Sequence, residues 1–375
     1  MLAWNNLWFQ QGYPVTSALN NTATVTIEEI SELLPTLEAV RANCDIADAR
    51  HATDYTLCVY LLKMREYFRW EKNLSFDQKL PHKELTEWLS CRESCWEALQ
   101  LRDFEKVPVL NALHDPFDAE AINQLLNPLG FVYSSGYGRS MKPMFYLGAL
   151  ETRESYKGYT LIVSGREYAR DLASQPAMSL GKTIFVRRES LRRMLWEKVE
   201  EWRWNKPVNA MQNALACYDF DNHAVQSLDA MTNNELRSVK IHEIGEVRAG
   251  ELLGNEWQAM LAGMPHSKTE IMVRAVRDHL ADALSTLPEL LSEMNVPALH
   301  FYIANLANMR KQLYPSLVAA YETWTTSGDS RAFESCTADS AAHWQTLCEK
   351  ILVIYRQKNT GYQQELISLI ESSPL

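Results

Sequence analysis

One stretch of the sequence carries carboxylates and an imidazole at helical spacing. Glu235, His242 and Glu246 are separated by seven and then four residues. An α-helix turns once in about 3.6 residues, so these three side chains share one face. Acid and imidazole groups stacked on one face are what a metal site in a helical bundle needs. A solvated helix face can have the same composition, with acid–histidine pairs that contribute only about a few tenths of a kcal/mol.

Two further segments carry a histidine followed three residues later by an aspartate. Carboxylate oxygens can bridge two cations, and imidazoles can complete each coordination shell. We therefore predict a site for iron or manganese in a helical region. Its predicted ligands are His242, Glu246, Glu235, His279, Asp282, His51 and Asp54.

The chemistry expected at such a site is oxidation. Iron with open coordination positions activates oxygen, so the predicted function is a non-haem metal-dependent oxidase or oxygenase acting on a small organic substrate. Tyr55 follows the His51–Asp54 pair and is predicted to relay protons or electrons, with surface packing as the alternative. The alternative function is a non-catalytic helical binding or assembly protein, whose aromatic-rich surface meets a partner.

Two runs of the sequence resemble those of an uncharacterised bacterial family of unknown function. They are His51–Cys58 (HATDYTLC) and His242–Gly254 (HEIGEVRAGELLG). The resemblance covers most of the chain and implies no activity, only that both runs belong to one site. The chain is also faintly similar to ferritin-like and haem-oxygenase-like di-iron proteins. The Glu-x-x-His motif of the ferritin-like proteins is absent, which leaves the number and identity of the metals open.

Two other segments carry groups that can hold an anion. The glycine-rich run Ser134–Lys142 follows a predicted strand and could bind an anion through backbone N–H groups, or form a hairpin turn. An arginine cluster opens a tryptophan-rich helix and could grip a phosphate or carboxylate, or form an ion-paired surface helix with interleaved glutamates. The cluster consists of Arg187, Arg188, Arg192 and Arg193.

Composition limits the class of protein. A net charge of −10 argues against nucleic-acid binding driven by overall charge. No apolar run reaches the roughly 18 to 20 residues that a membrane helix needs, and no signal peptide is visible.

The seven cysteines, without a CxxC motif, indicate reduced thiols in a cytoplasmic protein. The pair Cys91 and Cys95 is interpreted as buried apolar side chains, with half of a metal or redox pair as the alternative. The uncharged start with Trp4 and Trp8 suggests a homo-oligomer or a protein partner, or packing on its own domain.

The order of patterns predicts a mainly α protein of the α+β class, a helical bundle with a small antiparallel or mixed β-sheet inserted. Apolar residues recur at helical spacing before residue 105 and after residue 187, and short aromatic and β-branched runs lie between turns from 130 to 186. A helix is expected to open at Thr26, capped by Glu29, and a second to begin near Asp48. The expected regions are 1–129, helical; 130–186, the sheet; and 187–375, the bundle that carries the candidate site.

Overall fold

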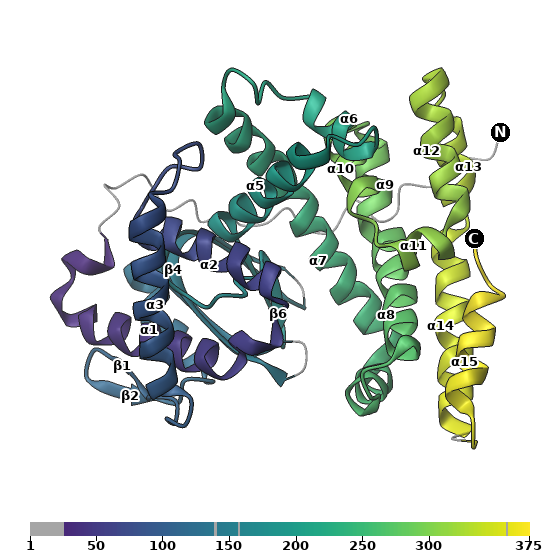
Figure 1. Cartoon of the computed structure of the whole chain (residues 1–375). Coiled ribbons are helices and arrows are strands. Elements are labelled where there is room, and N and C mark those ends of the chain that lie inside the picture. The colour runs from purple at the N-terminus through teal and green to yellow at the C-terminus, as the bar shows by residue number, and fades with distance from the viewer. Residues whose placement is uncertain (1–25, 139–140, 157, 358) are drawn as a thin grey trace. The chain divides into compact units, whose positions relative to one another are not determined.

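A computed structural model describes residues 26–138, 141–156, 158–357 and 359–375 (Figure 1). The described chain is mainly α-helical with a small mixed β-sheet, which confirms the predicted fold class. Contacts divide the chain into two compact units between Arg193 and Met194. Trp4 and Trp8 of the uncharged start, and Arg139 and Ser140 of the glycine-rich run, lie outside the described residues.

The first two helices of the first unit begin later than the sequence predicts. Pro35 has no N–H to donate and a fixed φ, so it suits a first turn, and α1 begins one residue before it. Residues 27–33 form two 3₁₀ turns instead of the start of an α-helix. The prediction of a second helix from Asp48 was also wrong, because α1 runs on to His51. The helices are α1 (Leu34–His51), α2 (Leu57–Glu71), α3 (His82–Leu99) and α4 (Ala119–Leu126).

A five-stranded sheet follows, in the order β3-β4-β5-β7-β6. Its strands are β3 (Phe131–Tyr137), β4 (Pro143–Ser155), β5 (Thr160–Arg170), β6 (Ala177–Leu180) and β7 (Thr183–Arg187). Only β5 and β7 pair in parallel; the other neighbours are antiparallel. Tyr137 pairs with Pro143, so the glycine-rich run connects a hairpin, as one of its two interpretations predicts. A separate ribbon pairs β1 (Val107–Val109) with β2 (Ala112–His114).

One face of α1 packs on this sheet. Leu37, Val40 and Cys44 recur at three-to-four spacing and share a buried cluster with Phe145 and Leu147 of β4. Because Cys44 faces the sheet, residues one position further along α1 project from a different face of the helix. The packing therefore fixes the direction of the polar side chains of α1 that are described below.

The second unit consists of helices. Its longest, α7, runs through the His242–Glu246 segment and has non-helical backbone at Gly254 (φ 72°). A π-helical turn, Asp282–Thr286, joins α8 to α9. The elements are α5 (Arg188–Asn205), which begins in the first unit, α6 (Ala210–Ala216), α7 (Ala224–Gly263), α8 (Lys268–Ala281), α9 (Leu287–Ser292), α10 (Val296–Asn305), α11 (Asn308–Leu313), α12 (Pro315–Ser327), α13 (Arg331–Thr337), α14 (Ser340–Gln357) and α15 (Tyr362–Glu371).

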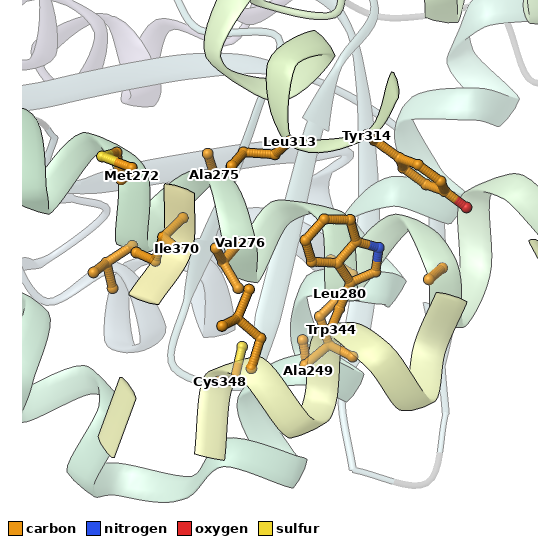
Figure 2. Packing of buried hydrophobic residues seen from close by; sticks show 14 of the residues in the cluster. Ala249, Met272, Ala275, Val276, Leu280, Leu313, Tyr314, Trp344, Cys348 and Ile370 are labelled. Atoms are coloured by element: carbon orange, nitrogen blue, oxygen red, sulfur yellow. The ribbon is translucent and has the colours of Figure 1, made fainter. Parts of the chain in front are cut away.

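The core of the second unit forms where α7, α8, α14 and α15 meet. Figure 2 shows Val276 and Leu280 of α8 beside Trp344 and Cys348 of α14. Trp344 is fully buried, and a buried aromatic side chain of this size dominates the apolar area that such a core removes from water. None of the helices in the described residues has the length and apolar character to cross a membrane.

All seven cysteines are free thiols. Cys91 and Cys95 of α3 are both exposed, so the interpretation of this pair as buried apolar side chains was wrong. Only Trp96 is buried on this helix.

Candidate functional site

The histidine–carboxylate cluster of the second unit depends on a close approach between α7 and α8. A Cβ atom added at Gly245 would overlap the backbone carbonyl oxygen of Ala281. A side chain at this position would therefore push the two helices apart. Gly245 lies three residues after His242, and Ala281 directly precedes Asp282, so the same approach brings His242 to Asp282.

Asp282 is fully buried at the start of the π-helical turn and accepts four hydrogen bonds. His242 Nδ1 and Thr286 Oγ1 each lie 2.8 Å from Oδ1. Tyr302 donates its hydroxyl to Oδ2 at 2.8 Å, and Arg310 Nη2 bonds the same oxygen. Because an ionised carboxylate offers about four acceptor positions, these donors saturate it.

The charges of this cluster compensate one another. Burial favours the neutral carboxyl of Asp282, but Arg310 and His242 outweigh it and lower its pKa. Burial also opposes the imidazolium form of His242, but the carboxylates of Asp282 and Glu246 outweigh it and raise its pKa well above the usual value. The two carboxylates therefore favour the imidazolium form of His242.

Glu246 closes the cluster on its outer side. Its Oε1 lies 3.6 Å from His242 Nε2, and Arg277 Nη2 lies 2.9 Å from its other oxygen. Burial would raise the pKa of Glu246, but His242 and Arg277 outweigh it and lower the pKa to about 2. The structure thus brings His242, Glu246 and Asp282 together, in an ion-paired network.

His279 points elsewhere on α8. Its ring stacks on Trp344 with centroids 4.6 Å apart, its Nε2 lies 3.0 Å from the carbonyl oxygen of Arg310, and its Nδ1 lies 3.4 Å from the Arg310 guanidinium. Burial, with Arg310 adding to it, lowers the pKa of His279 to about 3. Both ring nitrogens are occupied, so His279 packs and orients Arg310.

The other predicted site residues have separate surroundings. Glu235 is buried on α7, with the Asn234 amide 3.5 Å from Oε1, and burial raises its pKa to about 7. His51 and Asp54 belong to the first unit and bond one another at 2.8 Å. Tyr55 contacts Lys142, whose Nζ lies 3.4 Å from its hydroxyl. Across the described residues, no group of three or more His, Cys, Asp and Glu side chains could hold a metal ion. Iron or manganese, and a relay through Tyr55, stay predictions.

The first unit contains a cavity of about 750 Å³ that the histidine pattern did not predict. α1, α2, the segment after α2, α3, β5 and the first turns of α5 contribute its lining. Six arginines and five carboxylates line it, in a chain whose net charge is −10. The arginines are Arg41, Arg69, Arg92, Arg166, Arg192 and Arg193, and the acids are Asp45, Glu66, Glu71, Glu167 and Glu189.

Ion pairs hold part of this lining in place. Arg69 and Glu66, both buried on α2, bond at 3.0 Å. Arg92 of α3 bonds Asp45 of α1 at 2.9 Å and also Glu71 of α2. Since each pair satisfies buried or half-buried charges, these groups form a rigid wall.

Other guanidinium groups lie against aromatic rings. Arg192 lies over Phe76, 4.7 Å from its centroid, and Arg69 lies 5.9 Å from the same ring. Arg166 lies over Tyr168 at 5.2 Å, and Arg41 Nε donates to the Tyr168 carbonyl oxygen at 3.0 Å. A ring face orients a guanidinium that lies over it. The N–H groups of the guanidinium then point outward in its own plane.

Two carboxyl groups lie side by side at the α5 end of the cavity. Glu167 is buried and accepts from Arg193 at 2.5 Å and from Ser190. Burial would raise its pKa, but Arg193 and Arg170 outweigh this and lower it. Glu189 accepts from the backbone N–H of Glu167 at 2.8 Å, and burial together with the Glu167 charge raises its pKa.

The arginine cluster that opens α5 contributes two residues to this cavity. Arg192 and Arg193 line it, whereas Arg187 bonds Ser134 inside the sheet at 2.8 Å and Arg188 pairs with Glu151 at 2.7 Å. Sequence reasoning missed Arg41, Arg69, Arg92 and Arg166. Glu66 and Arg69 were visible as a pair at helical spacing, but their burial was not.

Comparisons with known proteins give a family and no activity. Residues 36–187 match the N-terminal domain, and residues 192–373 the C-terminal domain, of a family of unknown function (DUF6866). No curated protein and no solved structure matches the chain.

Proposed function

The chain belongs to the DUF6866 family of unknown function, and we propose that its first unit binds a small molecule carrying a phosphate, sulfate or carboxylate group. The observation that carries the proposal is the cavity of about 750 Å³ with six guanidinium groups around it. A cavity of this size is in the range of small-molecule sites.

The charge of the lining supports an anion as the ligand. Six positive groups stand against five negative ones, although the whole chain is strongly acidic. A concave site with low-dielectric walls concentrates ions of the opposite sign. Guanidinium groups match the planar oxygens of carboxylates and phosphates with two parallel hydrogen bonds. Arg166 and Arg192, oriented by Tyr168 and Phe76, are the residues we assign to the ligand.

Calorimetric titration with sulfate, inorganic phosphate and succinate tests this proposal. Chloride at matched ionic strength is the reference, because it measures general screening. We expect one site per chain, and a loss of affinity of about tenfold or more, equivalent to about 1.4 kcal/mol, in Arg166→Gln and in Arg192→Gln.

The matched control is Arg188→Gln, which removes a guanidinium from the same helix without touching the cavity lining. Its affinity should equal that of the parent protein. Absence of binding by all three anions would overturn the proposal, as would an equal loss of affinity in the Arg188 variant.

The metal-dependent oxidase remains a second hypothesis, and its support is the contact between His242, Glu246 and Asp282. The saturation of Asp282 by four donors counts against it, because a cation would have to displace one of them. Elemental analysis of protein purified without a metal-binding tag tests this hypothesis: bound iron or manganese that is lost in His242→Ala would support it, and protein without either metal would count against it.

A further inference from the structure

The cavity contains a carboxyl group placed to compete with an anion. Glu189 lies in the first turn of α5 and lines the cavity. Its Oε2 is fixed by the backbone N–H of Glu167 at 2.8 Å. An ionised Glu189 would present a negative charge to the space in which, on the proposed function, an anion binds.

The neighbours of Glu189 determine how readily it ionises. From β5, the Glu167 carboxylate and the Arg166 guanidinium act on it, and from α5 Arg193 does so. From β4, Tyr146 lies close enough that the Glu189 charge raises the pKa of the Tyr146 phenol. Burial and Glu167 favour the neutral acid, and they outweigh the two arginines, so the pKa of Glu189 is raised.

The two neighbouring acids therefore differ. Arg193, Ser190 and Ser174 surround the carboxylate of Glu167, and its pKa is lowered. Glu189 is held by a backbone amide, because its Oε2 accepts from the N–H of Glu167. Neither histidine nor lysine is among the described residues that line the cavity. Glu189 is therefore the lining group that we expect to take up a proton when an anion enters the cavity and adds a second negative charge to that of Glu167.

We propose that the cavity binds its anion together with a proton, which Glu189 takes up. The neutral carboxyl donates a hydrogen bond to the anion, and the carboxylate form repels it. One proton is bound for each anion, and no other bond is made or broken. The site would release its ligand as pH rises, and this inference rests on the proposed function.

Sulfate is the probe for this coupling, because its own charge is constant from about pH 5 to about pH 8. Calorimetry of the full chain should show sulfate affinity falling by up to about tenfold per pH unit above the pKa of Glu189. Titrations in two buffers of different ionisation enthalpy should show uptake of one proton per sulfate on the alkaline side. This second measurement uses the parent protein, so it does not depend on the folding of a variant.

Glu189→Gln imitates the neutral acid and should bind sulfate with the same affinity at both ends of the pH range. Glu151→Gln, which removes a carboxylate paired with Arg188 outside the lining, should keep the pH dependence. Binding without pH dependence and without proton uptake in the parent protein would overturn the coupling alone. A pH dependence that persists in Glu189→Gln would do the same. No sulfate binding at any pH would instead overturn the proposed function.

Discussion

The two units differ in where their charged side chains lie. In the second unit, Asp282 is surrounded by four donors, which come from α7, from its own π-helical turn, from α10 and from α11. In the first unit, guanidinium and carboxyl groups line a cavity of about 750 Å³. A network closed around a buried carboxylate stabilises a fold, whereas paired charges that border a cavity also face the space that a ligand would enter. Charged residue types alone do not distinguish the two.

The largest effect we expect is from removing the centre of the saturated network. Asp282→Ala removes the fully buried carboxylate that the Arg310 guanidinium and the partly exposed His242 imidazole share. Breaking a buried ion pair in this way costs about 3–5 kcal/mol of unfolding free energy. Denaturant unfolding followed by circular dichroism measures it.

Asp329→Asn is the control for this change. It removes a carboxylate that also pairs with an arginine, Arg331, but on the exposed surface, where water screens the pair. Its unfolding free energy should equal that of the parent protein within error. A small effect of Asp282→Ala would mean that the network does not stabilise the unit.

A smaller and pH-dependent effect is expected at Glu235, a buried acid of the second unit that lacks the cations around Asp282. Its pKa rises from an ordinary 4.5 to about 7. A raised pKa means that the folded state holds the proton more tightly than the unfolded state. The stabilisation is therefore complete below about pH 4.5 and is lost as pH rises through about 7.

Glu235→Gln removes this dependence. From pH 5 to pH 8 the parent protein should lose about 2–3 kcal/mol relative to the variant. Denaturant unfolding at the two pH values measures the difference. A constant difference between the two proteins across this range would show that Glu235 has an ordinary pKa.

The sequence placed His242 and Glu246 on one helix face and grouped Asp282 with them, but it could not show how the helices meet. His242 and Glu246 are four residues apart, and helical geometry alone places Nε2 3.6 Å from Oε1. The same geometry could not show that Asp282 faces His242 while His279 stacks on Trp344. Which of these two residues faces His242 depends on how α8 packs against its neighbours.

Tertiary packing also supplied two of the four donors to Asp282, which the sequence did not mark. Tyr302 and Arg310 come from α10 and α11, and neither has a local pattern that marks it. In the first unit the predicted anion contact of the arginine cluster at the start of α5 stays a prediction, and two of its members, Arg192 and Arg193, line the cavity. The interleaved glutamates favoured an ion-paired surface helix there, because a sequence does not show which ion pairs border a cavity.

The smallest effect expected concerns the helix approach that brings the network together. At Gly245 an added Cβ would meet the backbone of Ala281, which cannot rotate away as a side chain can. Gly245→Ala should therefore destabilise the second unit by about 1–2 kcal/mol, since overpacking costs about 1–3 kcal/mol and the better helix propensity of alanine returns up to about 1.

Gly250 provides the matched control, because it lies on the same helix and a Cβ there would meet nothing within 4 Å. Gly250→Ala should gain the propensity alone and stabilise the protein by up to about 1 kcal/mol. Each variant adds one methyl group, and only the one at Gly245 meets Ala281. Opposite signs of the two changes in unfolding free energy would therefore show that the effect comes from the close approach of α7 and α8. If both variants were stabilised, the helices could separate without cost, and the short distance between His242 and Asp282 would not depend on glycine.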